Sequence, residues 1–131
     1  MACRVAVANG TRRRRACAVR LRSGKVLVAQ VAATPLTRLR GLLGRKPPRP
    51  PLLITRCRDI HTFGMDNPID VAFLYGEGQV VKVERAVPPG QRVFASCLAH
   101  DQGAAVLERF SCKGEWLKVG DYPLIWEAFS L

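Results

Sequence analysis

Short apolar or alternating segments, separated by glycine and proline turns, recur along most of this chain and leave room for one short helix. Turn residues such as Ser23-Gly24, Gly76-Glu77-Gly78 and Pro88-Pro89-Gly90 stand between several of these segments. The strand-like segments cover residues 16–22, 25–33, 51–54, 71–75, 79–87, 92–95, 104–110 and 122–129. The pattern predicts a mainly β fold, a compact barrel or sandwich of seven or eight short strands.

One segment has the features of a helix. Thr34 is a good N-cap, and Pro35 suits the first helical position. Four leucines then fall on one face at helical spacing: Leu36, Leu39, Leu42 and Leu43. Gly44 supplies a C-terminal stop. We therefore expect one short α-helix near residues 35–43, followed by a proline-rich surface loop.

Length and composition fit a single globular domain. The chain has 131 residues, of which 48% are hydrophobic and 24% are charged. No run approaches the roughly 18 apolar residues of a membrane span, so we expect no transmembrane segment. We expect a basic N-terminal segment at 1–24, which can contain a first strand, and a single β domain at 25–131.

The cysteines and the first residues bear on location. Five cysteines are spread along the chain without a close pair, and no CxxC motif occurs. The opening MACRVAVANGTRRRR places its positive charges after a short apolar piece, which is the wrong order for a secretory signal. These features predict reduced thiols and a cytoplasmic location.

Charge is distributed unevenly. Residues 1–58 hold 15 Lys and Arg and no acidic residue, whereas all ten acidic residues lie in 59–131. Residues 4–58 could therefore bind a polyanion, either nucleic acid or an acidic membrane surface, with a contribution from the run Arg12, Arg13, Arg14 and Arg15. All nine aromatic residues lie at Phe63 or later, so the basic half lacks stacking platforms and nucleic acid is disfavoured. A solvated basic surface is the alternative.

Polar residues are densest between Arg58 and Asp70, in the segment RDIHTFGMDNPID. His61 with Asp70 is the sharpest pairing, because a carboxylate can orient an imidazole for general base work or metal binding. The alternative is structural: His61 ties a loop to a strand, while Asp70 caps a turn or pairs with Arg38. Cys57 near His61 invites a nucleophile interpretation, although spacing alone is weak support and a buried inert thiol is commoner.

The same segment resembles a known family. IHTFGMDNPIDVAFL resembles the signature of domain of unknown function 192 (DUF192, also called UPF0127), and RLRGLLGR at 38–45 resembles its Arg-Gly-Leu helix motif. Val106-Leu107-Glu108 and Lys118-Val119-Gly120-Asp121 resemble its closing features. The resemblance spans about residues 25 to 126 and implies a mainly β domain with one short helix and no established activity. Many members carry an aromatic-Met-Lys-Asn-Thr version of the central motif, so a role for His61 need not be general to the family.

These observations leave three hypotheses. The leading one is a non-enzymatic module that binds a small ligand or a protein in a cleft at the IHTFGMDNPID loop, with His61, Met65 and Asp70 at the rim and Arg38 supplying charge. The second is a small hydrolase or metal-assisted enzyme that uses His61 and Asp70. The third is the polyanion binder. No complete catalytic motif is present, and we predict no catalytic residue, no metal ligand and no cofactor. The chain itself is expected to be a monomer or a homodimer.

Overall fold

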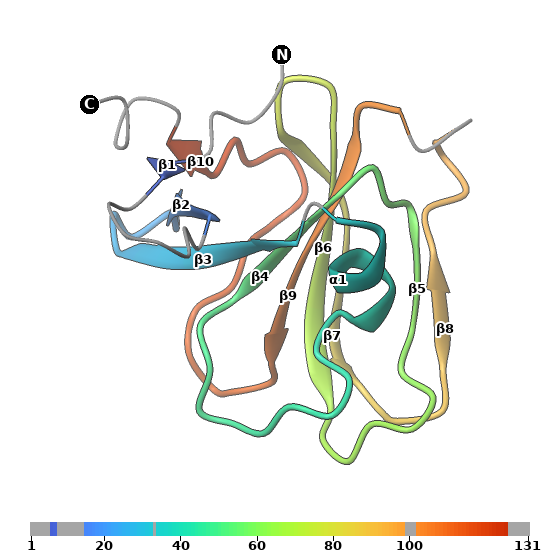
Figure 1. Ribbon diagram of the computed structural model, residues 1–131. Coiled ribbons are helices and arrows are strands. Elements are labelled where there is room, and N and C mark those ends of the chain that lie inside the picture. The colour runs from blue at the N-terminus through green and yellow to red at the C-terminus, as the bar shows by residue number, and fades with distance from the viewer. Residues whose placement is uncertain (1–5, 8–14, 33, 99–101, 126–131) are drawn as a thin grey trace.

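The computed structural model describes residues 6–7, 15–32, 34–98 and 102–125, and it is built mainly of β-strands (Figure 1). The strands are β1 (Ala6–Val7), β2 (Arg15–Arg20), β3 (Val26–Ala32), β4 (Leu52–Thr55), β5 (Asp59–His61), β6 (Ile69–Tyr75), β7 (Gln79–Val87), β8 (Arg92–Phe94), β9 (Ala104–Phe110) and β10 (Leu124–Ile125). A curled main sheet has the order β1-β2-β3-β4-β9-β6-β7, with β10 paired to β2, while β5 and β8 form a second sheet. The prediction of a mainly β fold with one short helix is confirmed.

The helix α1 (Pro35–Arg40) lies in the crossover between two parallel strands. β3 and β4 pair in parallel, so the chain between them must cross one face of the sheet to begin again at the same end. Figure 1 shows α1 in front of β4, β9 and β6. No helix among the described residues is long and apolar enough to cross a bilayer.

α1 ends sooner than the sequence predicts. A capping box fixes its start, because the Thr34 side chain accepts from the Thr37 N–H and the Thr37 side chain accepts from the Thr34 N–H. Gly41, with φ 53° and ψ −130°, ends it three residues before Gly44. The predicted leucine face is not buried as a unit: Leu36 and Leu39 are each 75% exposed, whereas Leu42, beyond the helix end, is buried.

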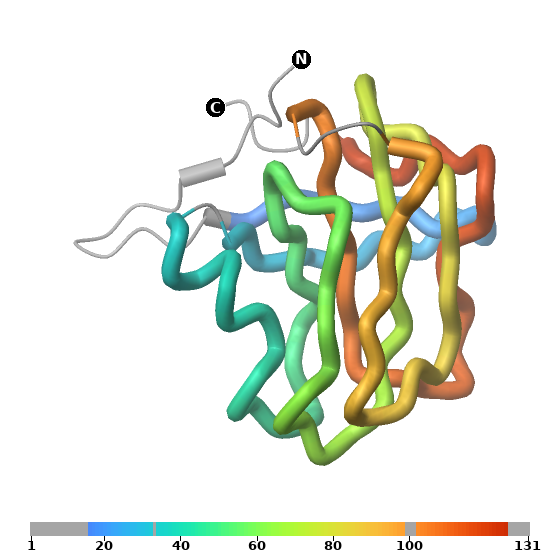
Figure 2. The backbone as a smooth tube through the Cα atoms, turned by 90° about the vertical axis from the view of Figure 1, so that its right-hand side faces the viewer, coloured from blue at the N-terminus to red at the C-terminus, as the bar shows by residue number. Residues whose placement is uncertain are grey.

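Each face of the main sheet is covered by its own hydrophobic cluster, as the period of two in a strand requires. We call them the helix face, covered by α1, β5 and β8, and the tryptophan face, covered by Trp116 and Leu117. The helix-face cluster includes Leu42, Ile54, Ile60, Val71, Phe73, Val93, Val106 and Phe110. The tryptophan-face cluster includes Cys17, Val19, Leu53, Ala72, Leu74, Leu107 and Trp116. Figure 2 shows β5 and β8 side by side in front of the main sheet.

Asp70 is fully buried in β6 and faces the tryptophan side, since its neighbours Ile69 and Val71 belong to the helix face. Its Oδ1 accepts hydrogen bonds from the Ala86 N–H at 2.9 Å and from the Ser111 hydroxyl at 3.0 Å. The chain bulges there: Ile69 pairs with Val87 but Val71 pairs with Glu84, and Ala86 takes a φ of 53°. The Asp70 carboxylate therefore binds the backbone of the bulge that ends β7.

Two arginines complete this network. The Arg109 Nε donates to Asp70 Oδ2 at 2.9 Å, and an Arg85 terminal nitrogen lies 3.4 Å from the same oxygen. The two terminal guanidinium nitrogens of Arg109 donate to the carbonyls of Glu115 and Gly114. The guanidinium carbon, Cζ, lies 4.4 Å from the centroid of the Trp116 ring. Asp70 thus joins β6, β7, β9 and the segment after β9 on one side of the sheet.

We predict that Asp70→Ala destabilises the fold by about 3 to 5 kcal/mol, because it leaves the Arg109 charge buried without its partner. Asp66→Ala, at an exposed position in the same segment, should change stability by less than about 0.5 kcal/mol. Urea unfolding at pH 7 measures both. A loss below about 1 kcal/mol for Asp70→Ala would show that the network contributes little.

The Asp70 carboxylate also makes the stability of the fold decrease in acid. Burial raises the pKa of Asp70, but hydrogen bonds from Ala86, Arg109, Ser111 and Arg85 outweigh it and hold the pKa below its ordinary 3.8. The Asp70 carboxylate binds a proton more readily in the unfolded chain than in the folded one. Its contribution to the free energy of unfolding is therefore present above the unfolded pKa and is lost as the pH falls through the folded pKa.

Candidate functional site

A pocket of about 100 Å³ opens on the helix face between α1, β5 and β9. It is lined by Arg38, Leu39, Arg40, Gly41, Leu42, Leu43, Ile54, Cys57, Asp59, Ile60, His61, Met65 and Glu108. An apolar cavity of roughly 150 Å³ can hold benzene, so this pocket encloses about four non-hydrogen atoms, and the rest of a larger molecule would extend from its mouth.

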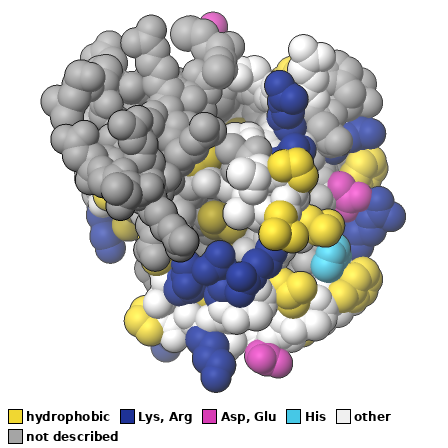
Figure 3. Space-filling model, viewed as in Figure 1, with side chains coloured by type: hydrophobic (Ala, Val, Ile, Leu, Met, Phe, Trp, Pro, Cys, Tyr) yellow, Lys and Arg dark blue, Asp and Glu magenta, His cyan; other side chains and the backbone are white. Residues whose placement is uncertain are grey.

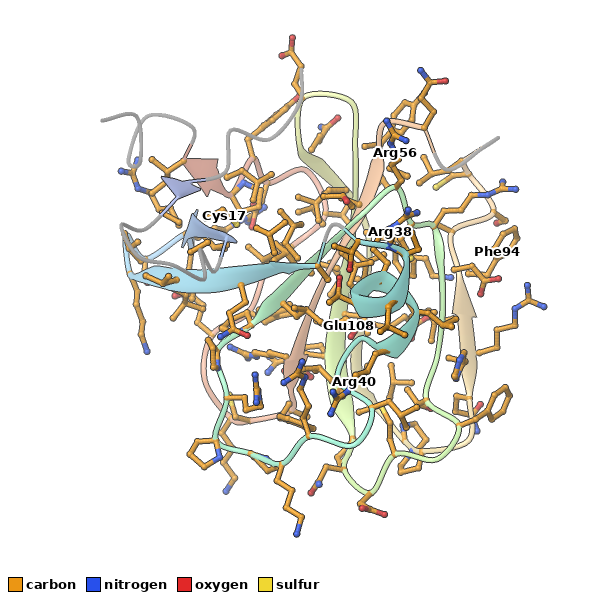
Figure 4. The ribbon with its side chains drawn as sticks, in the orientation of Figure 1. Cys17, Arg38, Arg40, Arg56, Phe94 and Glu108 are labelled. Atoms are coloured by element: carbon orange, nitrogen blue, oxygen red, sulfur yellow. The ribbon has the colours of Figure 1, made fainter. Side chains whose placement is uncertain are left out.

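Glu108 is the buried acid of this pocket, with 4% of its surface exposed. It lies on β9 behind α1, with Arg38 and Arg40 above and below it in Figure 4. The backbone N–H of Leu42 donates to its carboxyl. Burial raises the pKa of Glu108 to about 7, so both protonation states are populated near neutral pH.

Gly41 brings the backbone close to this acid. A Cβ added there would lie 3.2 Å from Glu108 Oε2, and φ of 53° with ψ of −130° is a conformation that other residues rarely adopt. The turn that follows α1 can therefore lie directly against β9 and present the Leu42 N–H to Glu108.

Two guanidinium groups of α1 line the same pocket. A terminal nitrogen of Arg38 donates to the Arg56 carbonyl at 2.6 Å, while its Nε is buried with no hydrogen-bond partner. The Arg40 Nε donates to the Leu43 carbonyl at 3.1 Å. No ion pair joins Glu108 to either arginine, so acid and guanidinium share the pocket without neutralising each other.

The opposite wall comes from β5, which Thr62 holds in place. The buried Thr62 hydroxyl donates to the Pro88 carbonyl at 2.7 Å and accepts from the Gln91 N–H at 2.8 Å. His61, the residue before it, is exposed, and its ring stacks on Phe63 with centroids 5.3 Å apart. The end of the strand thus holds His61 at the pocket edge.

The remaining polar groups of this wall have partners within the protein. Asp59 accepts hydrogen bonds from the Arg92 Nε at 3.0 and 3.1 Å. The half-buried Cys57 thiol donates to the Asp59 carbonyl at 3.2 Å. Across the part of the chain that the structure describes, no group of three or more His, Cys, Asp or Glu side chains is placed to hold a metal ion.

Three of the four residues predicted for a ligand site line this pocket, namely Arg38, His61 and Met65. Asp70 does not, because β6 begins at Ile69 and its alternation turns Asp70 to the tryptophan face. The predicted pairing of Asp70 with His61 is absent: its hydrogen bonds run to other residues, and its charge pairs with Arg85 and Arg109 instead of Arg38.

The sequence interpretation missed Glu108 as a site residue. Its signal is present in the strand, where a carboxyl stands between Val106 and Phe110 on a face that is otherwise apolar. β5 was missed as well, because the polar segment that contains it was read as a loop. For the polyanion hypothesis, Arg12, Arg13 and Arg14 lie outside the described residues, and Arg15 begins β2.

The pocket falls inside the part of the chain that matches a family model. The model of DUF192, described as uncharacterized ACR, matches residues 18–118, a span that contains every residue lining the pocket. The chain belongs to the DUF192 family. Membership in DUF192 brings no assigned activity, so the function of this DUF192 domain has to be argued from its own side chains. No curated protein matches the chain.

Two solved structures resemble this DUF192 domain. A protein of unknown function from Novosphingobium aromaticivorans DSM 12444 aligns with a TM-score of 0.63 and 19% identity, over 82% of this chain and 81% of that one. A proposed transcription regulator from Sinorhizobium meliloti 1021 aligns with a TM-score of 0.53 and 18% identity, over 73% of this chain and 79% of that one. At these identities the likeness establishes a shared fold.

We predict that Glu108→Gln stabilises the protein above neutral pH. The folded pKa of about 7 exceeds the ordinary glutamate value of 4.5, so the folded state binds the proton more tightly than the unfolded state does. The stabilisation that protonated Glu108 contributes is therefore fully present below about pH 4.5 and is lost as the pH rises through 7, by about 3 kcal/mol in total. Urea unfolding from pH 5 to pH 8 should show this loss in the wild type and not in Glu108→Gln. Glu84→Gln, at an exposed site, should keep the wild-type slope.

We also predict that Gly41→Ala lowers the free energy of unfolding by more than the backbone strain of a positive φ accounts for. Gly76→Ala is the matched control, because Gly76 has a φ of 62° and nothing lies within 4 Å of an added Cβ. The control should lose about 1 to 2 kcal/mol through backbone strain. Gly41→Ala should lose more, since its Cβ would press on Glu108. Equal losses in thermal or urea unfolding would contradict the close packing inferred here.

Proposed function

We propose that this chain is a non-enzymatic binding domain whose ligand occupies the pocket between α1, β5 and β9. The observation that carries the proposal is the meeting of the unpartnered Arg38 Nε and the buried Glu108 carboxyl in one small recess. Buried polar groups in folded proteins normally have partners. A bound ligand would supply the missing ones.

The surroundings of the mouth support a binding role. Leu39 lines the pocket and is 75% exposed, and Phe63, which stacks on His61, is 54% exposed. Figure 3 shows hydrophobic and basic side chains gathered on the face that carries α1 and β5. Single exposed apolar side chains are ordinary, whereas several around one recess are typical of a binding surface.

The contacts within the pocket favour binding over covalent catalysis. The Cys57 thiol donates a hydrogen bond to the backbone carbonyl of Asp59. The carboxylate expected to orient His61, that of Asp70, faces the other side of the sheet. The Asp59 carboxylate is bound by Arg92.

We predict that Met65→Trp, which places a larger side chain in the pocket wall, abolishes ligand binding while the fold is kept. The test is a ¹H–¹⁵N NMR screen of the full chain against a library of small polar compounds, with titrations extending above about 10 mM because so small a ligand binds weakly. Hits should shift the amides of Gly41, Leu42 and His61. Val119→Trp adds the same ring at an exposed position and should leave binding unchanged. Hits that bind Met65→Trp as well as the wild type would contradict the proposal.

A further inference from the structure

The Glu108 carboxyl and the Arg38 guanidinium, which line the same pocket, indicate which chemical groups a ligand would carry. Glu108 is buried and accepts a hydrogen bond from the backbone N–H of Leu42, and no cation of the described part of the chain forms an ion pair with it. The Arg38 Nε is buried with no acceptor, although its terminal nitrogen is held by the Arg56 carbonyl. A buried charge is costly without a partner of opposite sign. The ligand that satisfies both groups carries a cationic donor and an acceptor oxygen.

We propose that the pocket takes an α-amino group together with its neighbouring carboxyl or carbonyl oxygen, the nitrogen at Glu108 and the oxygen at Arg38. This inference rests on the proposed function and adds the chemical class of the ligand. Two sources share that chemistry, a free small amino acid and the N-terminus of a polypeptide.

Simpler ligands leave one group unsatisfied. A plain carboxylate would place its charge in a recess that already holds the Glu108 carboxyl. A plain amine would leave the Arg38 Nε without an acceptor and set a further cation between Arg38 and Arg40. An α-amino acid is dipolar, so it pairs with both groups and adds no net charge.

Size and lining agree with this class. A pocket of about 100 Å³ encloses about four non-hydrogen atoms, so it would hold most of L-alanine and leave the rest at the open mouth. Ile54, Ile60 and Met65 line the pocket as an apolar wall against which a small side chain can pack. A longer side chain would extend toward the exposed Leu39.

The pH dependence has a defined sign. A bound ammonium group favours the ionised form of Glu108, so binding releases a proton and tightens as the pH rises toward 8. The other charged or titratable groups that line the pocket are Arg38 and Arg40 from α1, Asp59 and His61 from β5, and Cys57. His61 lies at the edge of the same pocket, so its contribution is separated from that of Glu108 by substitution.

The experiment is a ¹H–¹⁵N NMR titration of the full chain with L-alanine, ethylamine and propionate. We expect L-alanine to bind at least tenfold more tightly than either fragment. Its affinity should rise about tenfold between pH 6 and pH 8, as a group with a pKa of about 7 loses its proton. Propionate binding as tightly as L-alanine, or affinity that rises toward acid pH, would overturn the inference.

Substitutions show which side chains bind L-alanine. Glu108→Gln should weaken L-alanine binding at least tenfold at pH 8 and remove the pH dependence of the affinity. Glu84→Gln should leave the affinity and its pH dependence unchanged. His61→Gln should retain the pH dependence if Glu108 is its source. Arg38→Gln should weaken binding, with Arg49→Gln, whose side chain contacts Gln30, as the matched control. Unchanged binding in Glu108→Gln would overturn the assignment.

Two further probes separate the sources. L-Alanyl-L-alanine presents a polypeptide N-terminus, and a preference for it over L-alanine assigns the site to chain ends. The reverse preference assigns it to free amino acids, and N-acetyl-L-alanine should not bind in either case. If these amines all fail while other compounds bind in a manner that Met65→Trp blocks, this inference is wrong and the proposed function stands. If no compound binds, both are wrong.

Discussion

Two charged residues that follow one another in β9, Glu108 and Arg109, are the constraint on which the arrangement depends. Because successive side chains of a strand point to opposite faces, one charge is buried on each side of the sheet. Arg109 is neutralised by Asp70 and packed on Trp116. Among the described residues Glu108 has no such cation, and a recess lies beside it. Arg109, which stabilises the fold, and Glu108, which we propose to bind a ligand, thus lie on opposite faces of the same strand.

The recess exists because the chain has to cross the sheet. Parallel pairing of β3 with β4 sends α1 over the helix face, and Gly41 ends that helix directly against Glu108. The turn then offers the Leu42 N–H to the carboxyl. Leu39, in the last turn of the helix, is exposed and lines the pocket. The short helix and the pocket therefore share one cause.

Much of the fold could be predicted from the sequence, because turn glycines and prolines mark the ends of the strands. The hairpin of β6 and β7 and the start of α1 at Thr34 follow from such local signals. β5 could not be recognised in this way, since it is a strand only through its pairing with β8, some thirty residues later. Asp70 was misassigned for a related reason. The sequence pattern starts the strand at Val71, which leaves Asp70 in the loop before it, whereas β6 starts at Ile69 and buries Asp70 within the sheet. The bulge at Ala86, which Asp70 binds, leaves no recognisable pattern in the neighbouring sequence.

The parallel pair β3–β4 also bears on how the pocket comes into being. The pairing brings Gln30 beside Leu52, and closing a connection of about twenty residues costs chain entropy that the contacts of the pair have to offset. The walls of the pocket belong to this crossover and to the β5–β8 pair, both of which require contacts between distant parts of the chain. The recess therefore exists only when both sets of long-range contacts are in place. A molecule that binds there would stabilise the folded chain in proportion to its concentration, since the unfolded chain has no such recess.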